Sequence, residues 1–133
     1  MKIKFYRLAD LDKNLKASVH KTGKMGFTAD AAKRLDLPNK KSANIGVNED
    51  DPLDKSLYLF LYTDSNTGDF KVIKAGEYYY LNTKILFDNL KVDYSGGDTV
   101  TFDISITEAD GETIYELKRR IKEKKNKYDN QES

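Results

Sequence analysis

The sequence contains no cysteine and only one histidine among its 133 residues. The absence of cysteine excludes disulfides and thiolate metal sites, and it leaves the redox compartment unmarked. The histidine, His20, has no partners at a spacing that would build a Ser-His-Asp or Cys-His arrangement. We therefore expect His20 to be a polar residue on a strand, and we expect a protein that is not an enzyme and uses no cofactor or metal.

Long apolar runs are also absent. No stretch of about 18 apolar residues occurs, and the first 13 residues lack the apolar segment of a signal peptide. We therefore expect no membrane partner and a cytoplasmic location. The glycine-rich segment "YSGGDTV" at 94–100 is not followed by Lys-Ser or Lys-Thr, and the next element is expected to be a strand. This segment is therefore predicted to be a turn and not a phosphate-binding loop.

The charge is nearly balanced overall and uneven along the chain. The net charge is +1, with 38% hydrophobic and 34% charged residues. Residues 1–55 hold 12 Lys or Arg against 8 Asp or Glu, residues 56–110 hold 4 against 9, and residues 111–133 hold 7 against 5. The length suits one domain at 1–120, followed by a flexible charged tail at 121–133. Basic flanks around an acidic middle are compatible with polyanion binding and also with ordinary surface scatter.

The acidic and aromatic runs each permit two interpretations. The run "NEDDPLD" at 48–54 has hard oxygen ligands for a divalent cation, but it lacks the spaced pattern of a calcium loop. We favour a solvated hairpin loop. The aromatic run "EYYYLN" at 77–82 could stack on exposed bases. Alternating aromatics on strands more often fill a core on one face and pair across strands on the other.

An internal repeat dominates the pattern. Thr28 precedes apolar residues at offsets of three, four and seven, and Thr83 does the same 55 residues later. These apolar residues are Ala31, Ala32 and Leu35 in the first copy and Leu86, Phe87 and Leu90 in the second. A polar cap followed by this spacing predicts a two-turn helix with one apolar stripe in each copy.

Strands are predicted on both sides of each helix. Short strands precede each helix and end at Gly23 or Gly76, which can supply the positive φ of a tight turn. Alternating apolar residues follow each helix, Ile45 with Val47 and Val100 with Phe102. Returning strands are expected at 56–63 and 112–119, although Ile114, Leu117 and Ile121 also fit a helix.

The predicted fold class is therefore mainly β with two short helices, built from tandem β-β-α-β-β units at about 1–55 and 56–118 that share one barrel-like core. Neither unit can bury enough apolar surface alone. One additional strand is expected at 2–8. The residues expected in the shared core are Leu35, Leu37, Ile45, Leu86, Phe87, Leu90, Val92, Val100 and Phe102.

The segment "GKMGFTADAAKRLDL" at 23–37 resembles the swapped-hairpin domain of AbrB-like and SpoVT-like transition-state regulators and MazE-like antitoxins. The second copy resembles this family best at "LKVDYSGGDTVTFDI", where Gly-Asp precedes a strand. The resemblance covers about 16–63 and 69–118. The sequence departs from the family at Thr28, where Pro is usual, and at Asp36 and Lys91, where Gly is usual. Family members exchange hairpins as dimers, so a tandem copy is expected to form this pair within one chain.

The resemblance implies DNA binding, in a transcriptional regulator or an antitoxin-like component. Carried over by position, it implies contacts from Lys24 after the turn and Lys33 on the helix. Their basic neighbours complete the candidate set, namely His20, Lys21 and Arg34. The second copy is acidic at the corresponding places, which favours the alternative of a protein-interaction or assembly module that contacts itself or another protein and binds no nucleic acid.

Overall fold

The computed structural model describes residues 1–3, 5 and 15–120. Within them, eight strands and two short helices confirm the predicted mainly β fold. The strands are β1 (Lys16–Val19), β2 (Lys24–Phe27), β3 (Ser42–Gly46), β4 (Leu57–Tyr62), β5 (Phe70–Ala75), β6 (Tyr78–Asn82), β7 (Val100–Ala109) and β8 (Glu112–Arg119), and the helical elements are α2 (Ala29–Arg34), the 3-10 turn η1 (Leu37–Asn39) and α3 (Lys84–Asn89). The order β-β-α-β-β occurs twice, as the repeat predicts.

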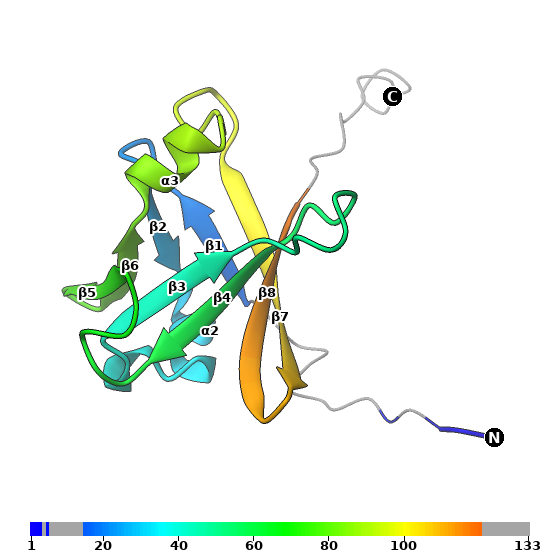
Figure 1. The fold of residues 1–133 in the computed structure, drawn as a ribbon. Helices are drawn as coiled ribbons and strands as arrows, with labels where there is room; N and C mark the ends of the chain where they lie inside the picture. The colour runs from blue at the N-terminus through cyan, green and yellow to red at the C-terminus, as the bar shows by residue number, and fades with distance from the viewer. Residues whose placement is uncertain (4, 6–14, 121–133) are drawn as a thin grey trace, which may run out of the picture.

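The strands close into an antiparallel barrel in the order β1-β2-β6-β5-β3-β4-β8-β7, with β7 returning to β1 (Figure 1). We call β1–β4 the first set and β5–β8 the second set. Exchanging the two sets strand for strand leaves this circular order unchanged. The β1–β2 hairpin pairs with β7 of the second set, and the β5–β6 hairpin pairs with β3 of the first set. The two sets therefore exchange their first hairpins, and every seam of the barrel except those inside a hairpin joins one set to the other.

The four strands of the first set end at Tyr62, because β3 and β4 pair as a hairpin. The predicted boundary between the two repeat units, near residue 55, falls inside the first set. The connection at 63–69 separates the first set from the second. Residues 112–119 form a strand, which settles the choice between strand and helix there. Of the strand expected at 2–8, residues 4 and 6–8 lie outside the described residues, and residues 2, 3 and 5 are not in a strand.

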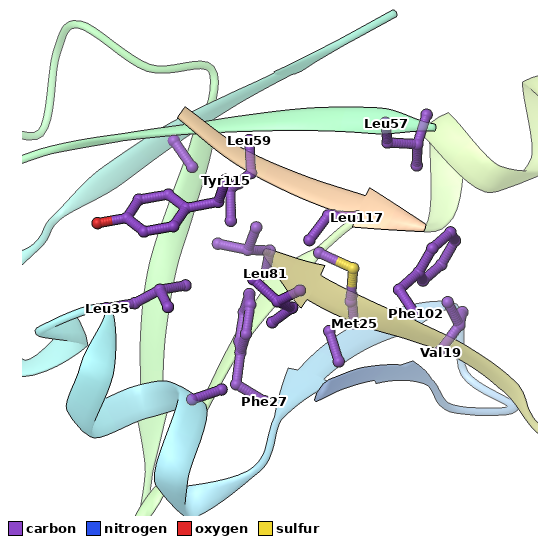
Figure 2. Close-up of a cluster of buried hydrophobic side chains, with 14 of the residues drawn as sticks. Val19, Met25, Phe27, Leu35, Leu57, Leu59, Leu81, Phe102, Tyr115 and Leu117 are labelled. Carbon is purple, nitrogen blue, oxygen red and sulfur yellow. The ribbon is translucent and has the colours of Figure 1, made fainter. Parts of the chain in front are cut away.

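The core fills the barrel with side chains from both sets (Figure 2). Inward residues alternate along each strand, as Ala17 and Val19 do on β1 and Met25 and Phe27 do on β2. Of the predicted core, five residues are buried, namely Leu35, Leu37, Phe87, Val100 and Phe102. Three others pack partly buried against them, namely Ile45, Leu86 and Val92. Burial of this single cluster is the main stabilising term of the fold.

The expectation that Leu90 is buried is wrong, because its side chain is 43% exposed. Its counterpart Leu35 is fully buried at the end of α2, where the helix presents only Ala31 and Ala32 to the core. In α3 the ring of Phe87 occupies this space instead and stacks on Phe102, with the ring centroids 6.0 Å apart. The larger side chain earlier in α3 therefore leaves Leu90 at the surface.

Replacing Phe87 by alanine should lower the free energy of unfolding by about 3–5 kcal/mol, because it removes a fully buried ring and leaves a cavity. Leu90→Ala is the matched comparison from the same helix, and we expect it to cost less than about 1 kcal/mol because surface substitutions do little. Urea denaturation with an unchanged slope measures both. Equal losses from the two variants would contradict the packing described for α3.

The turns adopt the left-handed backbone where the sequence predicts it, and also directly after each of the two helices. Gly23 and Gly76 have φ of 88° and 65°. Asp36 and Lys91 follow the two helices with φ of 55° and 56°, at the positions where the resembled family has glycine. After α3, the Val92 amide donates to the Phe87 carbonyl at 3.0 Å and the Lys91 amide donates to the Asp88 carbonyl at 3.1 Å. This is the Schellman arrangement that most often uses glycine in the left-handed position.

Lys91→Gly should therefore raise the free energy of unfolding by about 1 kcal/mol. A left-handed residue with a Cβ costs about 1–2 kcal/mol, and the extra freedom of glycine in the unfolded chain offsets part of the gain. Lys91→Ala keeps the Cβ and serves as the control, so it should not stabilise the protein. The midpoints of thermal and urea unfolding of the two variants test this difference. A glycine variant no more stable than the alanine variant would show that the turn carries no strain.

Candidate nucleic-acid interface

The β1–β2 turn carries three of the five predicted contact residues, and it is a tightly bonded turn. The amide of His20 donates to the carbonyl of Lys24 at 2.8 Å, and the amide of Gly23 donates to the carbonyl of His20 at 2.8 Å. Lys21 lies exposed between them. The turn therefore holds His20, Lys21 and Lys24 next to one another on a backbone that has little freedom to move.

The same turn is anchored to the helix of the other set. The buried hydroxyl of Thr83 donates to the carbonyl of Gly23 at 2.8 Å. A Cβ on Gly23 would lie 2.8 Å from the Cβ of Lys84, so only glycine permits this approach. Thr28 caps α2 by accepting from the Ala31 amide, but Thr83 makes no such side-chain bond to α3. The prediction of a side-chain cap at Thr83 is therefore wrong, because its hydroxyl is used to hold the hairpin.

Thr83→Val should lower the free energy of unfolding by about 1–3 kcal/mol, because it leaves the buried Gly23 carbonyl without its donor. Thr83→Ser keeps the hydroxyl and should retain most of the stability. Amide exchange of residues 20–24 should accelerate in the valine variant and not in the serine variant. If the valine and serine variants behave alike, the hydroxyl does not anchor the turn.

The outer surface of β2 brings residues of both sets together. The Nζ of Lys24 lies 4.9 Å from the centroid of the Tyr80 ring, within the range of a cation–π contact. Gly26 pairs with Tyr80 on one side and with Ser18 on the other. A Cβ on Gly26 would lie 2.7 Å from Nε2 of His20, so the imidazole lies over the bare backbone of Gly26. We call this surface, made by Ser18, His20, Lys24, Gly26 and Tyr80, the Lys24–Tyr80 face.

Charge is segregated between the two halves of the barrel. The adjacent strands β1, β2, β6 and β5 contain four lysines and no acidic residue. The other four strands, β3, β4, β8 and β7, contain four acidic residues against two basic ones. The lysines of the first half are Lys16, Lys24, Lys71 and Lys74. The strands of this half of the barrel therefore carry only basic charge, although Lys74 lies with Tyr79 on the core-facing side of β5 and not on the outer side with Lys24.

The tyrosines of β6 divide between core and surface. Tyr79 packs against the core, and the Nζ of Lys74 lies 6.0 Å from its ring centroid. Tyr80 is partly buried under Lys24, whereas Tyr78 is 73% exposed at the start of the strand. The aromatic run at 77–82 therefore presents one tyrosine freely to solvent, and a lysine ammonium already occupies the ring of another.

The five predicted contact residues do not form one footprint. His20, Lys21 and Lys24 lie at the β1–β2 turn beside α3, whereas Lys33 and Arg34 end α2 at the opposite end of the barrel (Figure 1). The hairpin turn and α2 lie at opposite ends of β2. The exchange of hairpins between the sets places the turn beside α3 instead.

Sequence reasoning also missed three partners of this surface. Tyr80, Gly26 and Thr83 contribute a ring, a bare backbone and the anchoring hydroxyl. Alternation along 78–82 was the available signal for Tyr80, since it separates an outward tyrosine from the inward Leu81. Nothing local in the sequence connects Thr83 to a turn 60 residues earlier.

The corresponding places of the second set carry no comparable cationic cluster. Asp88 on α3 pairs with Lys84 at 2.8 Å and accepts from the Tyr94 hydroxyl at 2.6 Å. These partners, Lys84 first, hold the pKa of Asp88 below its usual value. Glu77 follows Gly76 in the second turn, as Lys24 follows Gly23 in the first. The cationic surface is therefore centred on the first hairpin.

The acidic run at 48–54 forms an ordered loop in which carboxylates accept hydrogen bonds. Asp51 accepts from the Leu53 amide, and Asp54 accepts from the Ser56 amide, the Asn48 side chain and the Tyr58 hydroxyl. The bond from Tyr58 is the main cause that lowers the pKa of Asp54 to about 2, and it raises the pKa of Tyr58 to about 12. Within 1–3, 5 and 15–120, no three His, Asp or Glu side chains are grouped as metal ligands would be.

Comparison with protein-family models, with curated proteins and with solved structures gives no match to this chain. In the part of the chain that the structure describes, no helix has the length and apolar character needed to cross a membrane.

Proposed function

We propose that this chain is a non-enzymatic DNA-binding protein that contacts the phosphate backbone of duplex DNA through the Lys24–Tyr80 face and the adjoining β1–β2 turn. The observation that carries the proposal is the charge segregation: four neighbouring strands hold four lysines and no carboxylate. Lysines on a rigid sheet neutralise phosphates and release condensed counterions, which supplies most of the sequence-independent affinity for DNA.

The geometry favours phosphate contacts over base stacking. The Lys24 ammonium lies over the Tyr80 ring, so this ring is less open to an unpaired base, while the ammonium itself stays near the surface of the sheet. Lys21 extends the cationic surface along the turn. Thr83 and Gly23 fix the turn, so the side chains on it begin from a preorganised backbone.

The resemblance to the swapped-hairpin family supports a role as a transcriptional regulator or an antitoxin-like component. The exchange of first hairpins between the two sets agrees with what this resemblance leads us to expect from a tandem copy. A protein-interaction module is the second candidate, and the specific observation in its favour is the incomplete pairing of β4 with β8.

Replacing Lys21 and Lys24 together by alanine should weaken binding to all duplex sequences alike. The logarithm of the binding constant should depend less steeply on the logarithm of the salt concentration, by about 2, because each lost phosphate contact removes about 0.9 from the slope. Anisotropy titrations of a fluorescent duplex between about 50 and 200 mM salt measure this slope.

The matched control is Lys33→Ala with Arg34→Ala, which removes the same charge at the opposite end of the barrel. This variant should keep the slope of the natural protein. Equal loss in both double variants would assign binding to overall charge and not to this face. No binding of the natural protein at the lowest salt would reject the proposed function.

A further inference from the structure

The pairing between β4 and β8 stops halfway along both strands. The paired residues are Leu57 with Leu117, Tyr58 with Glu116, and Leu59 with Tyr115. Beyond this point β4 continues to pair with β3 as far as Tyr62, and β8 continues to pair with β7 back to Glu112. Residues 60–62 and 112–114 therefore remain in strands, but they are not paired with one another. Figure 1 shows the β3–β4 and β7–β8 hairpins diverging here.

Two hollows lie at the open half. One of about 310 Å³ is lined between the strands by Phe60, Leu61, Tyr62, Glu112, Thr113 and Tyr115, with Lys40 at its side. One of about 520 Å³ adjoins it and shares Phe60, Tyr62 and Glu112, with Asp69 and Phe70 among its further lining residues. The Lys40 ammonium donates to the Leu35 carbonyl at 3.0 Å. The other charged groups that line the two hollows are the carboxylates of Glu112 and Asp69.

We infer that the open half of this seam, residues 60–62 and 112–114, binds an extended peptide of a partner protein, with Arg or Lys at alternate positions and apolar residues between them. Edges of strands that lack a neighbour are templates for an added strand. Alternation along β4 and β8 places Phe60, Tyr62 and Glu112 on the outer side of the seam and Leu61 with Tyr115 on the inner side.

Successive side chains of an added strand would face the outer side and the inner side of the seam in turn. On the outer side, aromatic rings and the Glu112 and Asp69 carboxylates suit a guanidinium or an ammonium, through cation–π contacts and charge-assisted hydrogen bonds. On the inner side, Leu61 and Tyr115 suit apolar side chains. The acidic balance of the strands around this seam favours the same cationic partner.

The test uses the full chain and a labelled peptide, Thr-Arg-Val-Arg-Val-Arg-Thr. We expect saturable binding by anisotropy and slower amide exchange at the amides of 60–62 and 112–114 that face the seam. A probe with alternate backbone amides methylated should bind at least about tenfold more weakly, because it lacks the backbone donors that pair an added strand with its neighbour. A probe with Glu in place of Arg should not bind.

Glu112→Gln should weaken the Arg probe about three- to fivefold, as loss of an exposed ion pair does. Glu77→Gln, at the β5–β6 turn on the opposite half of the barrel, is the matched control and should change nothing. Binding that ignores methylation of the probe, or protection that appears away from 60–62 and 112–114, would overturn the inference. A probe that binds only after residues 1–9 are removed would assign the seam to this chain's own N-terminal segment, which also overturns it.

Discussion

The exchange of hairpins is the constraint on which the rest of the structure depends. The β1–β2 hairpin is bordered by β7 and β6, and both belong to the second set. A set of four strands on its own would leave these edges unpaired and half of each inward face in water. Met25 and Leu81, which are paired across β2 and β6 and fully buried, show the same dependence at the level of side chains. Folding of either set therefore requires the other.

This constraint acts on the backbone and leaves the side chains free to diverge. Asp36 and Lys91 share a left-handed φ although they carry opposite charges, because the chain must reverse direction after each helix. Thr28 and Thr83 both begin a helix, yet one caps the helix and the other holds the hairpin of the opposite set. The two sets therefore share a backbone conformation where closure of the barrel requires it, and their side chains differ in the contacts that they make.

The sequence was sufficient for the elements whose signals are local. A cap followed by apolar residues three, four and seven positions later located both helices, and Gly23 and Gly76 marked both first turns. Residues 112–119 were ambiguous because Ile114 and Leu117 lie three apart, a spacing that a helix stripe requires and that two faces of a strand also produce. Pairing with β7 along the whole strand decides between them, and this pairing is not encoded locally.

The candidate site was less predictable for the same reason. His20, Lys21 and Lys24 are neighbours in the sequence and remain neighbours in space, whereas their contacts Tyr80 and Thr83 come from the other set. The position of Leu90 depended on how much space Phe87 takes inside the barrel, which apolar spacing does not report. Local patterns therefore located the cationic turn, and only the closed barrel shows what lies beside it.

Closure of the barrel requires some features of the sequence and does not require others. Packing accounts for the inward residues, and the turns account for the residues with positive φ, but neither requires lysines on one half and carboxylates on the other. The same reasoning applies to the seam, because packing and turns do not account for the strand residues 60–62 and 112–114 that stay unpaired with one another. The proposed DNA face and peptide seam therefore rest on features that the stability of the barrel alone leaves unexplained.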